Sequence, residues 1–115
     1  MTISARNQLL ASPPHAVELA LKRLGADLRT ARTRRNLTVA EVAEKIGTGP
    51  RAILDAEKGK PSSGVAIFAA LLWTYDLLDQ LDAVADPARD ERGQRLALTS
   101  ERKRARHKKV LNDDF

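Results

Sequence analysis

The side chains that could support catalysis are few and lie far apart in the sequence. His15 and His107 have no metal-ligand neighbours, and the serines at positions 12, 62 and 63 have no base nearby. The chain has no cysteine, which excludes a disulfide framework and a thiolate metal site, and it has no glycine-rich phosphate loop. Nothing assembles into a nucleophile–base pair. We therefore expect a protein that is not an enzyme and that binds no metal or cofactor.

Four aspartates recur at helical spacing and raise the question of carboxylate chemistry: Asp76, Asp79, Asp82 and Asp86. Paired carboxylates can transfer protons or hold Mg²⁺. An acidic line of this kind is more often the solvated face of a helix. We therefore interpret these four residues as surface residues that carry no chemistry.

Positive charge gives a clearer indication. The formal net charge is +5, which points to a polyanionic partner, most simply nucleic acid, although many basic chains are merely soluble. The block Arg102–Lys109 contains no acid; such blocks are usually disordered, and we expect this one to add non-specific affinity for DNA. The chain ends in a small acidic segment with Phe115, which could contact a protein partner or be an untethered end.

A specific partner requires a defined recognition element, and the stretch from residue 37 to residue 60 predicts one. Thr38, with Glu41 three residues later, is a capping box at the start of a helix, and Gly47 ends that helix in the left-handed conformation. Pro50 suits the first position of a second helix, which runs to the next glycine. Two short helices joined by a glycine-centred turn are a helix-turn-helix.

These residues resemble the XRE, or lambda-repressor-like, helix-turn-helix family. The similarity extends over about residues 24–81. Residues 85–91 and the basic tail resemble HipB-type antitoxins, which are the DNA-binding partners of HipA-type kinase toxins. The resemblance implies an all-α, lambda-repressor-like domain of five helices with an extended first helix and a flexible basic C-terminal tail. The residues that carry the main resemblance are Leu37, Thr38, Glu41, Val42, Ala43, Ile46, Gly47, Ile53, Glu57 and Gly59.

The resemblance also implies roles for individual residues. The second helix should enter the major groove with its first residues, where the Arg51 fork can bind both acceptors of a guanine. Ala52 and Leu54 could contact thymine methyl groups, although Leu54 could equally be core. In the family pattern, the arginine at position 32 forms a structural ion pair with Glu57.

The remaining candidates would hold the DNA backbone. The N-terminus of the Thr38 helix is a natural phosphate seat, and Thr48 could cap the second helix or bind a phosphate. Val39, Gly49, Pro50, Leu54 and Asp55 depart from the family pattern, and Asp55 would repel phosphate if it faced the backbone. The candidate backbone contacts are Arg34, Arg35, Thr38, Thr48, Gly49, Lys58 and Lys60.

The sequence predicts an N-terminal arm over residues 1–12, a helix-turn-helix domain over 13–86, and a short helix with a basic tail over 87–115. Pro13–Pro14 should begin a long first helix, whose apolar stripe continues to Ala31. The extra turns of that helix could pack on the domain or on a second subunit. The expected helices are 14–35, 38–46, 50–58, 63–74 and 77–84, with a sixth near 88–98.

The helix over 63–74 is apolar around most of its circumference. Ser62 is its candidate N-cap, and Asp76 is the candidate cap of the next helix. We expect a core face of Val65, Phe68, Ala69 and Leu72, with Ile67, Ala70, Leu71 and Trp73 on other sides. Such a helix needs a second surface, which favours a homodimer with Trp73 and Tyr75 at the interface. The alternative is a core completed by the long first helix.

Together these features predict a sequence-specific repressor that binds double-stranded DNA at an inverted-repeat operator and acts as the antitoxin of a HipA-like kinase. The alternatives are a stand-alone XRE regulator and a protein-interaction module, which the altered recognition helix motivates. RNA binding through the tail is disfavoured because the chain lacks aromatic stacking platforms. No apolar run approaches the ~20 residues that span a bilayer, and no signal-peptide core is present. We expect a cytoplasmic, nucleoid-associated bacterial protein.

Overall fold

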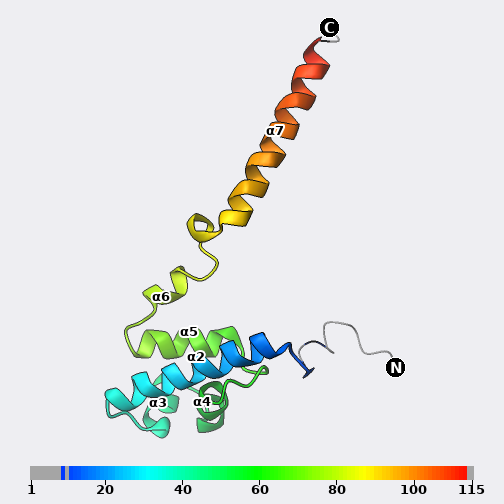
Figure 1. The fold of residues 1–115 in the computed structure, drawn as a ribbon. Helices are drawn as coiled ribbons and strands as arrows, with labels where there is room; N and C mark the ends of the chain where they lie inside the picture. The colour runs from blue at the N-terminus through cyan, green and yellow to red at the C-terminus, as the bar shows by residue number, and fades with distance from the viewer. Residues whose placement is uncertain (1–8, 10, 114–115) are drawn as a thin grey trace. The chain divides into compact units, whose positions relative to one another are not determined.

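The computed structural model describes residue 9 and residues 11–113, with side chains described as far as residue 108. All regular secondary structure in this part of the chain is helical, as the sequence predicts. The chain divides into two compact units, Met1–Leu81 and Asp82–Phe115, which are described separately below. Figure 1 shows the helices in chain order.

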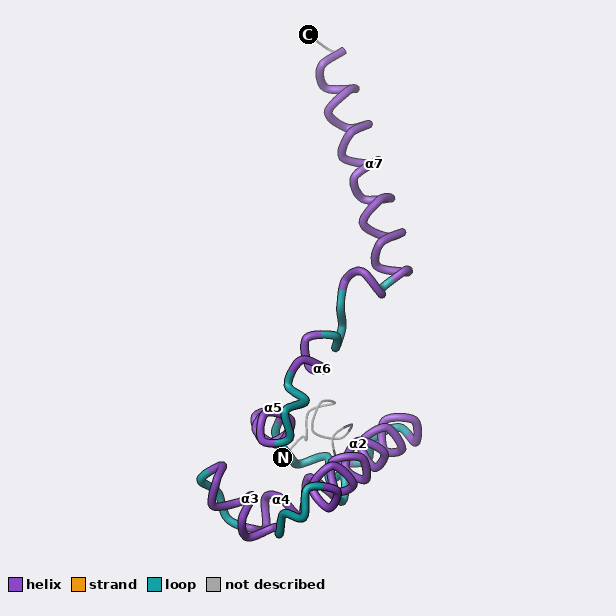
Figure 2. The backbone as a smooth tube through the Cα atoms, turned by 90° about the vertical axis from the view of Figure 1, so that its left-hand side faces the viewer, coloured by secondary structure: helices purple, strands orange, loops and turns teal. Residues whose placement is uncertain are grey.

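The first unit contains the helix-turn-helix. Its central helix is α4, which packs against α2, α3 and α5. Figures 1 and 2 show α3 and α4 next to each other at one edge of this unit. The elements are α2 (His15–Arg34), α3 (Val39–Ile46), α4 (Pro50–Glu57), α5 (Val65–Thr74) and the single turn α6 (Asp79–Asp82).

The signals at the ends of α3 and α4 act as the sequence predicts. The Thr38 hydroxyl accepts a hydrogen bond from the backbone N–H of Glu41 at 3.1 Å, and a Glu41 carboxylate oxygen accepts from the N–H of Thr38 at 3.2 Å. These bonds complete the capping box. Gly47 ends α3 with φ of 85°, and Pro50 occupies the first turn of α4. The turn between the two helices is therefore fixed by local chemistry.

Two glycines allow α2 to approach α4 closely. A Cβ atom on Gly25 would lie 2.5 Å from the carbonyl oxygen of Glu57. Gly59 has φ of +71°, and a Cβ atom there would lie 2.5 Å from the carbonyl oxygen of Leu21. No larger residue fits at either position without backbone movement, so these glycines set the spacing between α2 and the end of α4.

The core of the first unit is built almost entirely from aliphatic residues. Leu71 of α5 and Ile53 and Ala56 of α4 have no exposed surface. Because Ile53 and Ala56 lie on the same side of α4, their burial fixes which side of that helix faces the core. Of the α2 stripe, Leu28 and Ala31 are buried, whereas Val17 and Leu24 are exposed. The buried set is Leu28, Ala31, Val42, Ala43, Ile53, Ala56, Phe68, Leu71, Leu72 and Tyr75.

Helix α5 differs from its prediction in its start and in part of its buried face. It begins at Val65 after Gly64, which makes no side-chain cap, so Ser62 is not the N-cap. Phe68 and Leu72 are buried as predicted, whereas Val65 is 72% exposed and Leu71 is fully buried, which reverses the expected places of Val65 and Leu71. The physical reason is that α5 has apolar residues on every side, so its pattern could not indicate which side faces the core.

The segment after α5 also departs from the prediction. Asp76 adopts a left-handed conformation with φ of 59° and does not cap a helix. The N–H of Leu77 donates to the carbonyl of Leu72 at 2.7 Å, which closes the end of α5. The expected helix over 77–84 is reduced to α6, while Leu77 and Leu81 pack against the core. The tight reversal at Asp76 thus takes up the residues that would have formed its first turn.

The second unit contains the 3-10 turn η1 (Pro87–Arg89) and the 23-residue helix α7 (Glu91–Asp113). Asp86 caps η1 by accepting from the N–H of Ala88. Asp90 caps α7, because its carboxylate accepts from the N–H of Gly93 at 2.9 Å. The expectation of a helix confined to 88–98, followed by a flexible tail, is therefore wrong for the described residues.

The helix continues through the basic block for a local reason. Arginine, lysine, alanine and leucine all have high helix propensity, and α7 consists largely of these residues. The Gln94 amide also donates to the carbonyls of Pro87 and Ala88 at 3.0 Å each, which ties the start of α7 to η1. Propensity and capping outweigh the mutual repulsion of like charges on which the prediction of disorder was based.

Candidate nucleic-acid interface

The outer face of α4 is set by its buried face. Because Ile53 and Ala56 are inside, Arg51, Leu54 and Lys58 share the opposite side at spacings of three and four residues. The Arg51 side chain is 75% exposed, and Leu54 is 38% exposed, so Leu54 belongs to the surface and not to the core. Ala52 is half-buried beside them. The structure thus presents a guanidinium and a small apolar group along one exposed helix face.

Asp55 organises the cations around it. One of its carboxylate oxygens lies 3.6 Å from Arg51 Nε and 3.2 Å from Lys60 Nζ. The side chain of Asp55 is 25% exposed. Neither contact is a hydrogen bond, but the two nearby cations offset the negative charge of the carboxylate. The i, i+4 spacing of Arg51 and Asp55 was a sequence signal for this pair, whereas the contact with Lys60 depends on the loop.

The ion pair between Arg32 and Glu57 is present in the structure. Arg32 Nε donates to Glu57 Oε2 at 2.7 Å and Nη2 donates to Oε1 at 2.9 Å. The two side chains are 12% and 6% exposed, and the hydrogen bonds that Arg32 donates to Glu57 raise the pKa of Arg32 above its usual value. Arg32 Nη1 also donates to the carbonyl of Leu37 at 3.0 Å. This bidentate pair fixes the end of α4 and the start of the α3 segment to α2.

Arg35, predicted to bind phosphate, has a structural role instead. Its Nη1 and Nη2 donate to the carbonyls of Ala31 and Tyr75, each at 2.8 Å. Its guanidinium lies 5.6 Å from the centre of the Tyr75 ring. These contacts join the C-terminal ends of α2 and α5, so the guanidinium is committed within the fold. Arg34, its neighbour, is exposed.

The two aromatic residues proposed for an interface have different environments. Tyr75 is 1% exposed and belongs to the core, so its predicted place at a dimer interface is wrong. Burial raises the pKa of Tyr75, and its hydroxyl has no hydrogen-bond partner among the residues that the structure describes. Trp73 is 58% exposed, and Lys45 Nζ lies 5.4 Å from the centre of its ring. Phe115 lies outside the described residues.

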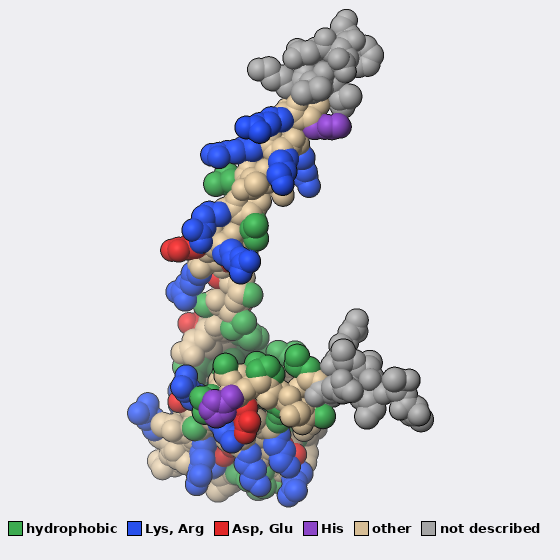
Figure 3. Space-filling view, turned by 45° about the vertical axis from the view of Figure 1, so that its right-hand side comes forward, with side chains coloured by type: hydrophobic (Ala, Val, Ile, Leu, Met, Phe, Trp, Pro, Cys, Tyr) green, Lys and Arg blue, Asp and Glu red, His purple; other side chains and the backbone are tan. Residues whose placement is uncertain are grey.

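The other candidates lie around the helix ends. The Thr38 hydroxyl is occupied in the capping box, beside the exposed first turn of α3. Thr48 does not cap α4, because Gly49 is the capping residue and no side-chain bond is formed. Lys58 is exposed immediately after α4. Figure 3 shows Lys and Arg side chains on one surface of the first unit, and others along α7.

Within the described residues, neither a metal centre nor a membrane span is present. No group of three or more His, Cys, Asp or Glu residues in that part of the chain could hold a metal ion. No described helix is long and apolar enough to cross a membrane. The acidic line from Asp76 to Asp86 forms no such group, and its members lie at or near the surface.

Comparison with known proteins gives one match. Residues 23–84, more than half of the chain, match the family model described as a helix-turn-helix domain. No curated protein and no solved structure matches the chain. The matching family is broader than the HipB-type antitoxins, and its members are typically non-enzymatic. The match covers α3, α4 and α5 together with most of α2, and the chain therefore belongs to the helix-turn-helix family of DNA-binding regulators.

Proposed function

We propose that this protein is a sequence-specific transcriptional repressor that binds an inverted-repeat operator in double-stranded DNA as a homodimer. The observation that carries the proposal is the fixed orientation of α4. Ile53 and Ala56 are completely buried, and the Arg32–Glu57 pair holds the end of the helix. A helix held in this way can present the same side chains to every site that it meets, which base readout requires.

Arg51 is the base-reading residue in this proposal. It lies in the first turn of α4, the part of a recognition helix that reaches base edges in the major groove. Its guanidinium can donate to both acceptors of a guanine, and the Asp55 carboxylate at 3.6 Å orients it along the helix. Ala52 and Leu54 supply apolar contact to thymine methyl groups.

Phosphate contacts position α4 on the duplex. The exposed N-terminus of α3 at Thr38 provides backbone N–H groups, and the turn residues Thr48 and Gly49 lie just before α4. Lys58 and Arg34 are exposed cations. Lys60 can also contact a phosphate, although its charge is partly offset by the nearby Asp55 carboxylate. Arg35 is left out of the proposed interface because two of its N–H groups donate to backbone carbonyls of α2 and of the residue after α5.

The dimer proposal rests on the outward face of α5. Phe68, Leu71 and Leu72 turn inward, and the opposite side carries Ala66, Ala70 and Trp73, with no charge anywhere in the helix. Trp73 is 58% exposed on that side, and Val65, in the first turn of the helix, is 72% exposed. A second copy would cover this face, and two-fold symmetry would place two α4 helices about one DNA turn, ~34 Å, apart. Sedimentation with and without operator DNA tests this association.

The test of specific binding compares operator and scrambled duplexes by fluorescence anisotropy, with the DNA upstream of the gene as operator source. Arg51→Ala should cost about 1–3 kcal/mol of discrimination, the value of a bidentate guanine contact. Arg23→Ala, which removes one exposed charge from α2, is the matched control. Equal weakening of both duplexes by Arg51→Ala would make Arg51 a phosphate contact. No binding of wild type to any duplex would favour a protein-interaction module.

We propose, as a more specific role, that the repressor is the antitoxin of a HipA-like kinase and represses its own operon. Support comes from residues 85–91 and the basic C-terminal block, which resemble HipB-type antitoxins. The test is co-purification with the product of the neighbouring gene. A kinase-like protein that co-elutes and loses activity in the complex supports the role. A neighbour that is no kinase, or that elutes separately, supports a stand-alone regulator.

A further inference from the structure

Helix α7 carries its positive charge unequally around its axis. At 3.6 residues per turn, a set spaced by three, four, three and four residues falls within an arc of about 80°. All of these residues are exposed. We call this set the arginine stripe: Arg92, Arg95, Thr99, Arg102 and Arg106.

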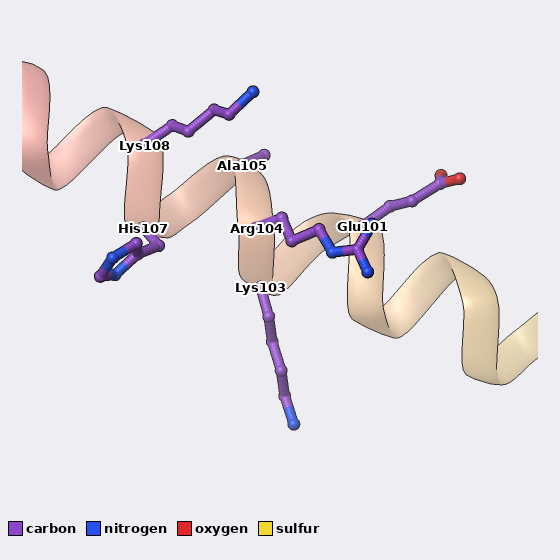
Figure 4. A pocket seen from close by; sticks show the side chains of 6 residues that line it. All are labelled: Glu101, Lys103, Arg104, Ala105, His107 and Lys108. Atoms are coloured by element: carbon purple, nitrogen blue, oxygen red, sulfur yellow. The ribbon is translucent and has the colours of Figure 1, made fainter.

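The opposite side of α7 is less densely charged. Arg104 and Lys108 project about 180° from the centre of the stripe, by the same helical geometry. Figure 4 shows Lys103, which borders the stripe, and Lys108 pointing in opposite directions from the helix. The recess around them is lined by residues of this one helix, from Glu101 to Lys108. It is a space between neighbouring side chains and is no ligand site.

The stripe depends on a helix that begins at a fixed residue. Asp90 caps α7 through the N–H of Gly93, and the Gln94 amide bonds both Pro87 and Ala88. The hydroxyl of Thr99 donates to the carbonyl of Arg95 at 3.0 Å, so the one uncharged member of the stripe turns back to its own helix. The capped helix therefore places the arginines at regular spacing on one side, which an unstructured basic segment would not do.

We propose that α7 is a second DNA-binding element, which docks on the phosphate backbone of duplex DNA through the arginine stripe. This inference rests on the proposed function, because it takes DNA as the partner of the whole chain. The stripe is about 21 Å long at 1.5 Å per residue. Each DNA strand presents a regular row of phosphates that winds around the duplex. Guanidinium groups bind phosphate oxygens bidentately, so an aligned row of arginines is complementary to a row of phosphates.

Other partners fit this helix poorly. A membrane-surface helix needs an apolar face, but Leu96 and Leu98 point to different sides and the face opposite the stripe carries Arg104 and Lys108. A coiled coil needs a seam of apolar residues spaced alternately by three and four positions, and no side of α7 carries such a seam. Single-stranded RNA calls for aromatic stacking platforms, and α7 contains no Phe, Tyr or Trp. Duplex DNA is the partner that the charge pattern favours.

The experiment compares two double variants of the full chain. Arg102→Gln with Arg106→Gln removes two charges from the stripe, and Arg104→Gln with Lys108→Gln removes two charges from the opposite side at the same spacing. Binding to operator and scrambled duplexes is measured at several salt concentrations. The stripe variant should lower the slope of log affinity against log salt by about 1.8, since each lost phosphate contact contributes about 0.9. The opposite-side variant should change it much less.

A third variant alters geometry and leaves every charge in place. Ser100→Pro interrupts the helix between Arg95 and Arg102, which takes the two halves of the stripe out of line. We expect the salt slope to fall although no charge is lost, while circular dichroism records the lost helix. An unchanged slope would mean that alignment is irrelevant and would overturn the proposal.

The remaining outcomes separate this proposal from the proposed function. Equal effects of the two double variants would reduce α7 to a diffuse positive charge, and no effect of either on DNA binding would assign α7 to another partner. Both results overturn the proposal while operator binding stands. If wild type fails to discriminate the operator, specific repression fails, but the scrambled duplex still tests the stripe.

Discussion

Helices α4 and α7 both expose arginines, but the protein holds them in different ways. Helix α4 has two completely buried residues and an anchored end, through Ile53, Ala56 and the Glu57 carboxylate. All described side chains of α7 except Gly93 are exposed, and only capping bonds at its start fix it. A buried anchor sets where Arg51 of α4 points, whereas a cap sets only the residue at which α7 begins. The first arrangement suits base readout, and the second suits phosphate contact.

The largest expected effect comes from removing the anchor of α4. Glu57→Gln leaves Arg32 largely buried and without its charged partner, which costs on the order of 3–5 kcal/mol. The melting temperature of the first unit should fall steeply, while the helix signal of α7 should persist. Glu18→Gln is the control, because its pair with Lys22 is exposed and should barely affect melting. An unchanged melting temperature for Glu57→Gln would show that the pair does not anchor α4.

The next effect tests the spacing between α2 and α4. Gly25→Ala places a methyl group against the Glu57 carbonyl, which would lie 2.5 Å away. Overpacking of this kind costs about 1–3 kcal/mol, and operator discrimination should fall with stability because α4 shifts. Gly64→Ser is the control: a Cβ atom there meets nothing within 4 Å, and serine is a better N-cap. Thermal melting of both variants gives the comparison. A stable Gly25→Ala variant would mean that α2 can move away without loss.

The same contrast explains how far the sequence could be interpreted. Capping residues and glycines act on their immediate neighbours, so Thr38, Gly47 and Pro50 gave the bounds of α3 and α4 correctly. The side of α5 that faces the core is a tertiary property, and an evenly apolar helix carries no local record of it. Arg35 and Tyr75 were misassigned for the same reason, because their contact joins two helices forty residues apart in the chain.

The candidate site divides in the same way. Its position on α4 and the exposure of Arg51 followed from a 3.6-residue period and a family pattern. The contact between Asp55 and Lys60 could not be foreseen, since it depends on how the loop after α4 returns. In the second unit, the charge composition suggested disorder. The helix propensity of the residues in α7, which acts locally, outweighs the repulsion between their like charges. The spacing of the arginine stripe is visible in the sequence, but it places the arginines on one side only if the segment is helical.

A smaller effect should follow from releasing Arg51. Asp55→Asn removes the carboxylate that lies 3.6 Å from Arg51 and 3.2 Å from Lys60. Both cations then become available to any phosphate, so affinity for scrambled DNA should rise by more than affinity for the operator. The net result is a loss of discrimination, which we expect to be less than about tenfold, or 1.4 kcal/mol. Anisotropy titrations of the two duplexes measure it. Improved discrimination would show that Asp55 impairs readout instead of orienting it.

The smallest effect is expected at Tyr75, beside the Arg32–Glu57 anchor. Its hydroxyl is buried without a hydrogen-bond partner, so Tyr75→Phe removes an unsatisfied polar group and keeps the packed ring. Stability near pH 7 should therefore change by no more than about 0.5 kcal/mol, or increase slightly. Burial raises the pKa of Tyr75, so the folded state favours the neutral phenol. This contribution to stability is complete below the unfolded pKa of about 10 and is lost as the pH rises through the higher folded value.

Tyr75→Phe should accordingly remove part of the alkaline destabilisation of the wild type. The chain has one tyrosine, so ultraviolet absorbance of the phenolate reports its titration without interference. Melting temperatures of wild type and variant, measured from pH 7 to pH 11, should coincide at neutral pH and separate above pH 10. A variant that is much less stable than the wild type at pH 7 would contradict this prediction. It would mean that the Tyr75 hydroxyl forms a stabilising hydrogen bond beside the Arg32–Glu57 pair.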